Sequence, residues 1–206
     1  MAVLQTTTSS KNSRRALILV ILFLFADLMV PQLYPAATLQ EDANPSRVST
    51  TWNFSVSSDT MIESSIPVAS YGSDGSASIG IDGASESRML LEFDLNLSSV
   101  QVHSATLNLE CAQGDGESAF FQTSNLTRSF NESNANWIDS NTSVAWEEMG
   151  AESLIDRSAW EPSLAVSSNG TVNLNVTRLV QQRVINSWSS MRLIVAGTDS
   201  QYEGYT

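Results

Sequence analysis

Apolar and polar side chains alternate most clearly between residues 87 and 110. In the first half of this stretch every second position is apolar, which gives one face made of Met89, Leu91, Phe93 and Leu95. Because successive residues of a strand point to opposite faces, the pattern predicts a strand with one buried face. Residues 97–101 can form a turn, and the alternation around Leu107 predicts a second strand that pairs with the first or crosses over from it.

The same period of two predicts further strands along the chain. We expect them at 47–58, 119–129 and 170–176, with a buried strand at 191–196. The Ser- and Gly-rich segment 64–87 predicts short strands, one of them near 78–81, joined by glycine turns. After residue 176 the apolar spacing becomes that of a short helix, with Thr177 as its expected N-cap. The pattern as a whole predicts an all-β fold of two stacked antiparallel layers with one short helix.

The N-terminal segment has the pattern of an export signal. Lys11, Arg14 and Arg15 precede an apolar run that begins at residue 16 and continues past Asp27 to Val30. We expect residues 1–37 to be a signal peptide, with an uncleaved signal anchor as the alternative. The run is shorter than the ~20 residues that comfortably span a bilayer. Residues 38–46 are polar and form the expected linker, and 47–206 form a single domain.

Charge and cysteine content limit the classes of partner that we expect. The formal net charge is −12, with a pI of about 4.3, so the chain repels phosphate backbones and we expect no nucleic-acid partner. We expect a secreted or cell-surface protein that contacts a membrane only through the N-terminal segment, if that segment is uncleaved. Cys111 is the single cysteine, which rules out an internal disulfide. It is interpreted as a small buried hydrophobe, with a reactive thiol or an intermolecular bridge as alternatives.

Several motifs resemble one known family. The stretches RMLLEFDL (88–95) and SATLNL (104–109) resemble the centre of the DNRLRE family of extracellular β-sandwich domains. Trp137 and Trp146 resemble its paired tryptophans, and VNLNVTRLV (172–180) with Trp188 resembles a later motif. The chain departs from the pattern at residues 133–134, where the family has an acidic residue, and at Asn175, where it prefers Asp.

The resemblance covers roughly residues 59–206 and implies an antiparallel sandwich of the jelly-roll type that binds carbohydrate. It also implies that Trp137 and Trp146 anchor loops. The sandwich would continue with a last strand after Thr206, which leaves two alternatives: a fragment of a longer protein, or a strand donated by another chain.

Two residues are candidates for ligand contact. Trp160, in a polar segment, offers a flat ring on which a sugar could stack, although tryptophans are commonly packed inside proteins. Arg88 could pair with a uronate, or structurally with Glu92 or Asp94.

Metal binding has one candidate pair. Asp74 and Asp82 lie beside glycines, an arrangement that forms turns and that can also wrap a structural calcium ion. We expect a turn, and no cofactor other than calcium.

The sequence does not favour catalysis. His103 is its one histidine, and a single histidine cannot form a zinc site. We expect it at the flank of a strand. Glu147, Glu148 and Glu152 could serve a glycosidase, but such pairs arise by abundance in an acidic chain. We therefore expect a protein that is not an enzyme.

Asn-x-Ser/Thr sequons are frequent, and three in turn-like segments are candidates for glycosylation: Asn131, Asn141 and Asn169. Four further sequons lie at Asn53, Asn96, Asn125 and Asn175.

The expected function is a non-catalytic secreted or cell-surface module whose partner is a polysaccharide or a component of the cell envelope. One alternative is a purely structural envelope or adhesin domain that binds no free sugar. The other is an accessory domain of an extracellular polysaccharide-degrading enzyme.

Overall fold

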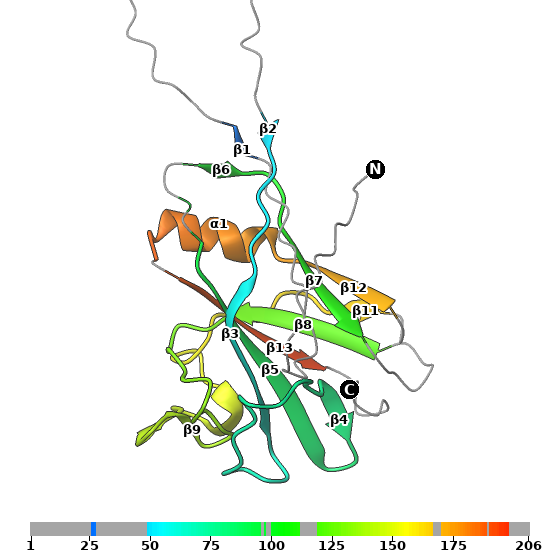
Figure 1. The fold of residues 1–206 in the computed structure, drawn as a ribbon, viewed down its shortest axis with the longest axis vertical. Helices are drawn as coiled ribbons and strands as arrows, with labels where there is room; N and C mark the ends of the chain where they lie inside the picture. Colours follow the sequence, from blue (N-terminus) through cyan, green and yellow to red (C-terminus); the bar gives the residue numbers. More distant parts are fainter. Residues whose placement is uncertain are drawn as a thin grey trace, which may run out of the picture.

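A computed structural model describes residues 26–27, 49–95, 97, 100–111, 119–166, 170–188 and 190–197 (Figure 1). The expected signal segment lies outside the described residues except for 26–27, as do the expected linker and the sequon residues Asn96 and Asn169. No helix among the described residues is long and apolar enough to cross a membrane.

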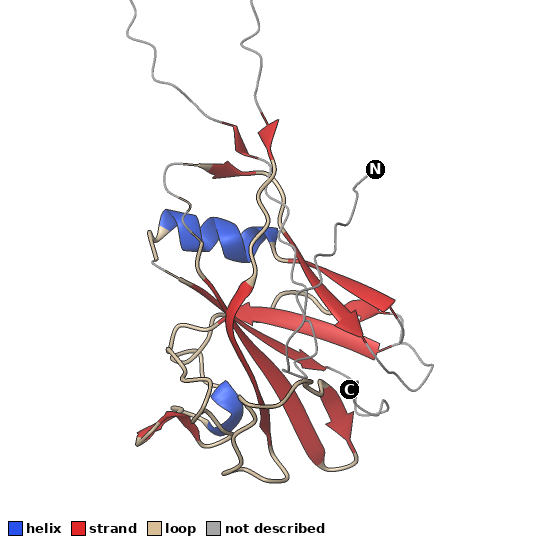
Figure 2. Ribbon diagram, in the orientation of Figure 1, coloured by secondary structure: helices blue, strands red, loops and turns tan. Residues whose placement is uncertain are grey.

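The centre of the fold is an antiparallel sheet of six strands, as expected for an all-β protein (Figure 2). Five strands follow one another in the order β11-β8-β13-β5-β3, and β4 pairs with the start of β5. The strands are β3 (Val56–Glu63), β4 (Gly80–Asp82), β5 (Ser85–Phe93), β8 (Ala119–Asn125), β11 (Leu164–Val166) and β13 (Met191–Gly197). Strand β13 lies in the middle because it pairs with both β5 and β8.

Smaller elements surround this sheet. Strands β7 and β12 form a separate two-stranded antiparallel sheet, β9 and β10 form another, and β1 lies between β2 and β6. Their bounds are β1 (Ala26–Asp27), β2 (Ser49–Thr50), β6 (Gln101–Val102), β7 (Thr106–Cys111), β9 (Asp139–Asn141), β10 (Val144–Ala145) and β12 (Gly170–Asn175). A 3-10 turn covers Met149–Ala151, and the α-helix α1 covers Thr177–Ile185.

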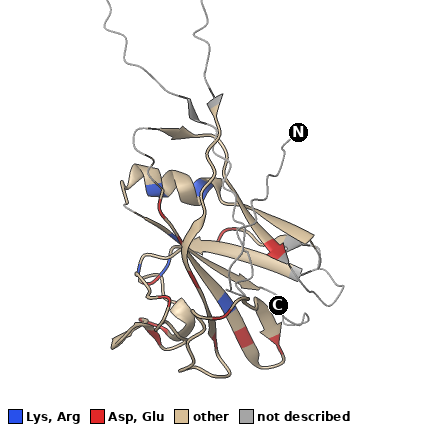
Figure 3. Cartoon of the chain, viewed as in Figure 1, with Lys and Arg blue, Asp and Glu red and all other residues tan. Residues whose placement is uncertain are grey.

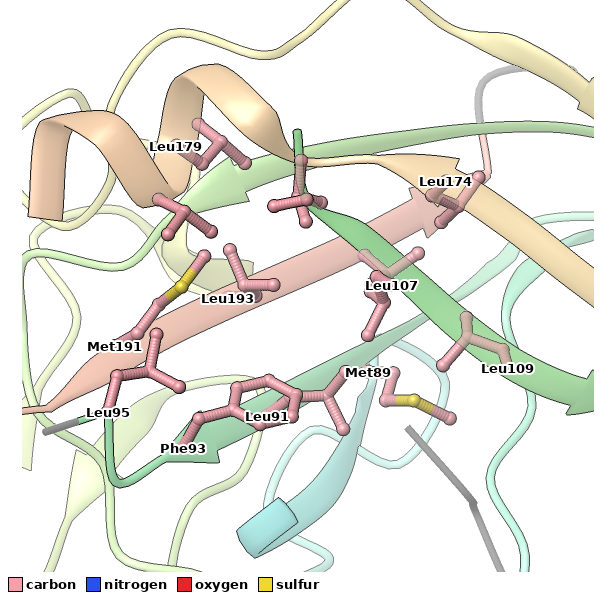
Figure 4. Close-up of a cluster of buried hydrophobic side chains, with 14 of the residues drawn as sticks. Met89, Leu91, Phe93, Leu95, Leu107, Leu109, Leu174, Leu179, Met191 and Leu193 are labelled. Atoms are coloured by element: carbon pink, nitrogen blue, oxygen red, sulfur yellow. The ribbon is translucent and has the colours of Figure 1, made fainter. Parts of the chain in front are cut away.

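One face of the six-stranded sheet forms the first core. Met89, Leu91 and Phe93 of β5 are buried there, as the alternation predicted. Figure 4 shows them facing side chains of β7, β12 and α1, including Leu107 and Leu179. The two-stranded β7–β12 sheet and α1 therefore cover this face of the six-stranded sheet.

The opposite face is also covered, which the sequence pattern did not predict. Leu90 of β5 and Ile194 of β13 are fully buried, and they pack with Phe130 and Trp146 from the segment between β8 and β11. These residues form the second core. The expectation of a half-buried strand is therefore wrong over the middle of β5. The alternation fails there because a strand that is covered on both faces carries apolar residues on both faces; the segment that covers the second face holds β9, β10 and the 3-10 turn.

Other expectations need smaller corrections. The segment 47–58 is not one strand, because β2 ends at Thr50 and β3 begins at Val56 and continues to Glu63. The second strand of the 87–110 stretch crosses over, since β7 pairs with β12 and not with β5. The strands expected at 119–129, 170–176 and 191–196 are confirmed as β8, β12 and β13.

The start of α1 differs from the expectation. Thr177 is the first helical residue and Val176 occupies the N-cap position. Asn175 Oδ1 accepts the Thr177 backbone N–H at 3.0 Å, and the Thr177 hydroxyl accepts the Ala105 backbone N–H at 2.9 Å. The threonine thus ties the helix to the residue before β7, and Asn175 satisfies the backbone N–H of the first helical residue.

Candidate binding pocket

Arg88 lies in the second core and is almost completely buried. Its Nε atom contacts Glu86 Oε1 at 2.6 Å, and Nη1 contacts Glu152 Oε2 and the Gly150 carbonyl oxygen, both at 2.7 Å. The expected pairing with Glu92 or Asp94 is wrong, because Glu92 pairs with Arg192 on the neighbouring strand. Buried between these acceptors, the Arg88 guanidinium holds the loop of residues 150–152 onto the sheet.

Trp160 belongs to the same cluster. It is half-buried against the second core, with the Arg157 guanidinium carbon 4.1 Å and that of Arg88 5.9 Å from the ring centroid. Arg88 also lies 5.0 Å from the Trp137 ring. These guanidinium groups occupy ring area that a stacked sugar would need. The geometry therefore gives Arg88 and Trp160 structural contacts, and a role for either residue in ligand contact stays a prediction.

The resemblance implies that Trp137 and Trp146 anchor loops. Trp146 is buried and its Nε1–H donates to the Asn136 carbonyl oxygen at 2.9 Å, while Trp137 packs against the second core. Both residues lie as loop anchors would.

Asp74 and Asp82 are both exposed and lie at turns. The Asp74 backbone N–H donates to the Tyr71 carbonyl oxygen at 2.9 Å, and Asp82 precedes Gly83, whose φ of 57° forms the turn between β4 and β5. Within the described residues no group of three acidic, histidine or cysteine side chains could hold a metal ion. The turn role is observed at both positions, and a calcium ion at Asp74 and Asp82 stays a prediction.

A cluster of polar side chains lies next to Asp74. Glu63 accepts hydrogen bonds from the hydroxyls of Ser65, Tyr71 at 2.7 Å and Ser85 at 3.2 Å. The hydrogen bond from Ser65, followed by that from Tyr71, lowers the pKa of the Glu63 carboxyl. Burial, together with the bond to Glu63 and the nearby negative charges, raises the pKa of Tyr71 to about 12. The cluster fixes the loop after β3.

The candidate glycosylation residues differ in their surroundings. Asn131 and Asn141 are exposed, and Asn141 ends β9 at the turn to β10. Asn125 is buried, and its Nδ2 donates to the Leu179 carbonyl oxygen at 3.2 Å. Since a glycan is attached to that nitrogen, Asn125 is not available in the folded chain.

The residues considered for catalysis lie on different segments of the chain. His103 is exposed between β6 and β7, far in sequence from the acidic residues near β10. Glu152 contacts both Arg88 and Arg157 at 2.7 and 2.6 Å. Glu152 is therefore engaged in two ion pairs that hold its loop against the sheet.

The structure instead places a pocket between the six-stranded sheet and the β7–β12 sheet, next to α1. Its volume is about 470 Å³, within the range of about 300–1,000 Å³ found for ligand sites. It is lined by Phe121, Thr123, Glu161, Pro162, Ser163, Leu164, Leu174, Asn175, Thr177, Arg178 and Gln181. The residues thus come from β8, the segment leading into β11, the end of β12 and the first turns of α1 (Figure 1).

An ion pair crosses this pocket. Arg178 Nη2 contacts Glu161 Oε1, and the Glu161 side chain is largely buried while half of the Arg178 side chain is exposed. The Glu161 backbone N–H donates to the Thr123 carbonyl oxygen at 2.8 Å, and Gln181 Nε2 donates to the Val102 carbonyl oxygen at 2.9 Å. These two hydrogen bonds hold one residue of each wall in place.

The chemistry of the lining is mixed. Leu164, Leu174 and Pro162 are apolar, while hydroxyl, amide, carboxylate and guanidinium groups lie among them. Such a lining can bind a ligand that is apolar on one side and rich in hydrogen-bonding groups on the other.

Sequence reasoning missed this pocket. Its residues lie in four segments between positions 121 and 181, and no local spacing connects Glu161 with Arg178. The change from strand to helix period at residue 176 was the one local signal near it, because strand-to-helix junctions expose polar backbone groups. No protein-family model matches the chain, and no curated protein matches it either.

Proposed function

We propose that this chain is a non-catalytic, secreted or cell-surface module that binds polysaccharide and attaches the protein that carries it to the cell envelope. The observation that carries the proposal is the pocket beside α1, which combines apolar and hydrogen-bonding groups on fixed walls. A sugar ring has the same two kinds of surface, with C–H groups on its faces and hydroxyls around its edge.

Two sequence features support the extracellular setting. The basic residues and apolar run before residue 31 have the composition of an export signal. The motifs at 88–95 and 104–109 resemble the DNRLRE family, which implies an extracellular sandwich of the jelly-roll type. The six-stranded sheet with the β7–β12 sheet over one face is compatible with that arrangement.

The charge distribution supports binding that does not depend on a large electrostatic patch. Acidic and basic positions are scattered along the described part of the ribbon in Figure 3. The formal net charge of −12 favours solubility, and it disfavours adhesion to anionic polymers.

The test is retention of the full chain on a panel of insoluble polysaccharides and on purified cell envelopes, at physiological ionic strength. We expect retention on at least one polysaccharide and release by its soluble oligosaccharide. The matched control is the same chain unfolded in urea and assayed in buffer that contains urea. The unfolded chain should not be retained. Absence of retention on every polysaccharide would contradict the proposal, and retention on envelopes alone would favour a structural envelope domain.

A further inference from the structure

We infer that the pocket beside α1 selects neutral saccharides and that the Glu161–Arg178 pair holds two adjacent hydroxyl groups of one sugar. This inference rests on the proposed function and adds the class of ligand to it. It also replaces Trp160 and Arg88 as the expected contact residues.

The first step is the placement of the two charged groups on opposite walls. Glu161 comes from the segment that leads into β11, and Arg178 from the first turn of α1. Their contact spans the space between the two walls. A ligand that enters the pocket therefore meets both groups at once.

The second step is their hydrogen-bonding chemistry. A carboxylate only accepts hydrogen bonds, and a guanidinium only donates them. A hydroxyl does both, so two adjacent hydroxyls can bridge the pair, one donating to Glu161 and the other accepting from Arg178. Glu161 Oε1 is buried against Arg178. Because half of the Arg178 side chain is exposed, it can move aside, and a ligand hydroxyl can then donate to the Glu161 carboxylate in its place.

The third step is charge. The two groups sum to zero inside the pocket, and the whole chain carries a formal charge of −12. A uronate or sulfated polymer would be repelled by the protein as a whole, and Arg178 offers it no net attraction because Glu161 neutralises that charge. A neutral polyol has no such penalty, and its apolar ring face can pack on Leu164 and Pro162.

The experiment measures the affinity of the full chain for soluble neutral polysaccharides, such as a β-glucan and a galactomannan, and for polygalacturonate. Each is titrated at low and at high salt. We expect a neutral polymer to bind with an affinity that salt changes little, because no net charge is neutralised on binding. Tighter binding of polygalacturonate, or binding that high salt abolishes, would overturn the inference.

Variants locate the site. Glu161→Gln and Arg178→Gln each remove one charged hydrogen bond, worth about 1.5–3 kcal/mol, and should weaken binding about 10- to 100-fold. Ser163→Trp should block the pocket while Glu161 and Arg178 themselves stay unchanged. The matched control is Arg192→Gln, which removes a guanidinium from an ion pair outside the pocket and should leave affinity unchanged.

The failures of the two proposals are distinguishable. Binding that survives all three pocket variants would overturn this inference and leave the proposed function standing. Binding of no polysaccharide by the unmodified chain would overturn both.

Discussion

Arg88 shows how one residue can determine the position of a distant loop. It is buried in β5, yet its acceptors include the Gly150 carbonyl oxygen, 62 positions away, and Glu152, 64 positions away. A buried guanidinium is costly unless its N–H groups are paired, so the fold around Arg88 is stable only while that loop is in place. The rings of Trp137 and Trp160 complete its surroundings.

We therefore expect Arg88→Met to lower the free energy of unfolding by about 3 kcal/mol, because it removes the cation of Glu86, one of the two cations of Glu152 and the donor to the Gly150 carbonyl oxygen. Urea unfolding followed by circular dichroism measures the change. The control Arg192→Met removes a more exposed arginine that has one ion-pair partner, and it should cost about 1 kcal/mol or less. Equal losses in the two variants would show that burial around Arg88 contributes nothing.

The raised pKa of Tyr71 predicts how the stability of the fold depends on pH. Its pKa is raised from the ordinary 10.0 to about 12 in the folded chain, so the fold stabilises the neutral phenol. This contribution is complete below pH 10 and is lost as the pH rises from 10 towards 12. In a spectroscopic titration of tyrosinate, the difference between the unmodified chain and Tyr71→Phe should show one group that ionises near pH 12. A difference curve centred near pH 10 would contradict the hydrogen bond to Glu63.

At the scale of elements, the segment between β8 and β11 is shaped by one glycine. Gly150 has a φ of 77°, and its backbone N–H donates to the Trp137 carbonyl oxygen at 2.7 Å. A Cβ atom at this position would lie 2.6 Å from the Trp137 ring. The 3-10 turn at Met149–Ala151 can therefore approach Trp137 only because residue 150 has no side chain.

A comparison of two glycines tests this explanation. Gly83 also has a positive φ, of 57°, but a Cβ there would meet nothing within 4 Å. We expect Gly83→Ala to cost about 1 kcal/mol from backbone strain alone. Gly150→Ala should cost at least about 2 kcal/mol, since the clash with the ring adds to the strain. Thermal unfolding of both variants measures the difference, and equal shifts would mean that the contact with Trp137 relaxes freely.

At the scale of the whole molecule, the six-stranded sheet separates two cores. The first contains Phe93 and Leu107, and the second contains Leu90 and Trp146. Both cores share β5 and β13, because neighbouring residues of these strands point to opposite faces. Loss of either core would expose one face of the same strands.

The two cores should therefore unfold together. Trp137, Trp146 and Trp160 report on the second core, and replacing Trp52 and Trp188 by Phe removes the other two of the five tryptophans. In this double variant, we expect the urea transition seen by tryptophan fluorescence to coincide with that seen by far-ultraviolet circular dichroism. A fluorescence transition at lower urea would show that the loops of the second core detach before the sheet unfolds.

The sequence by itself determined the local elements of this protein. The alternation around Phe93 predicted β5 and its buried face, and the same period predicted β8, β12 and β13. The change of period after residue 176 predicted α1 to within a few residues. These predictions succeeded because alternation and helical spacing act between residues close in the chain.

Only the tertiary structure decided the pairing of β7 with β12, the burial of Leu90, the partners of Arg88 and the pocket that joins Glu161 to Arg178. Each of these depends on segments that are far apart in sequence and meet only when the sheets pack. An irregular loop such as the one carrying Trp146 has no period, so its position over the sheet leaves no trace in the local pattern. The physical reason is that hydrophobic spacing specifies which face of an element is buried, and long-range packing specifies what covers it.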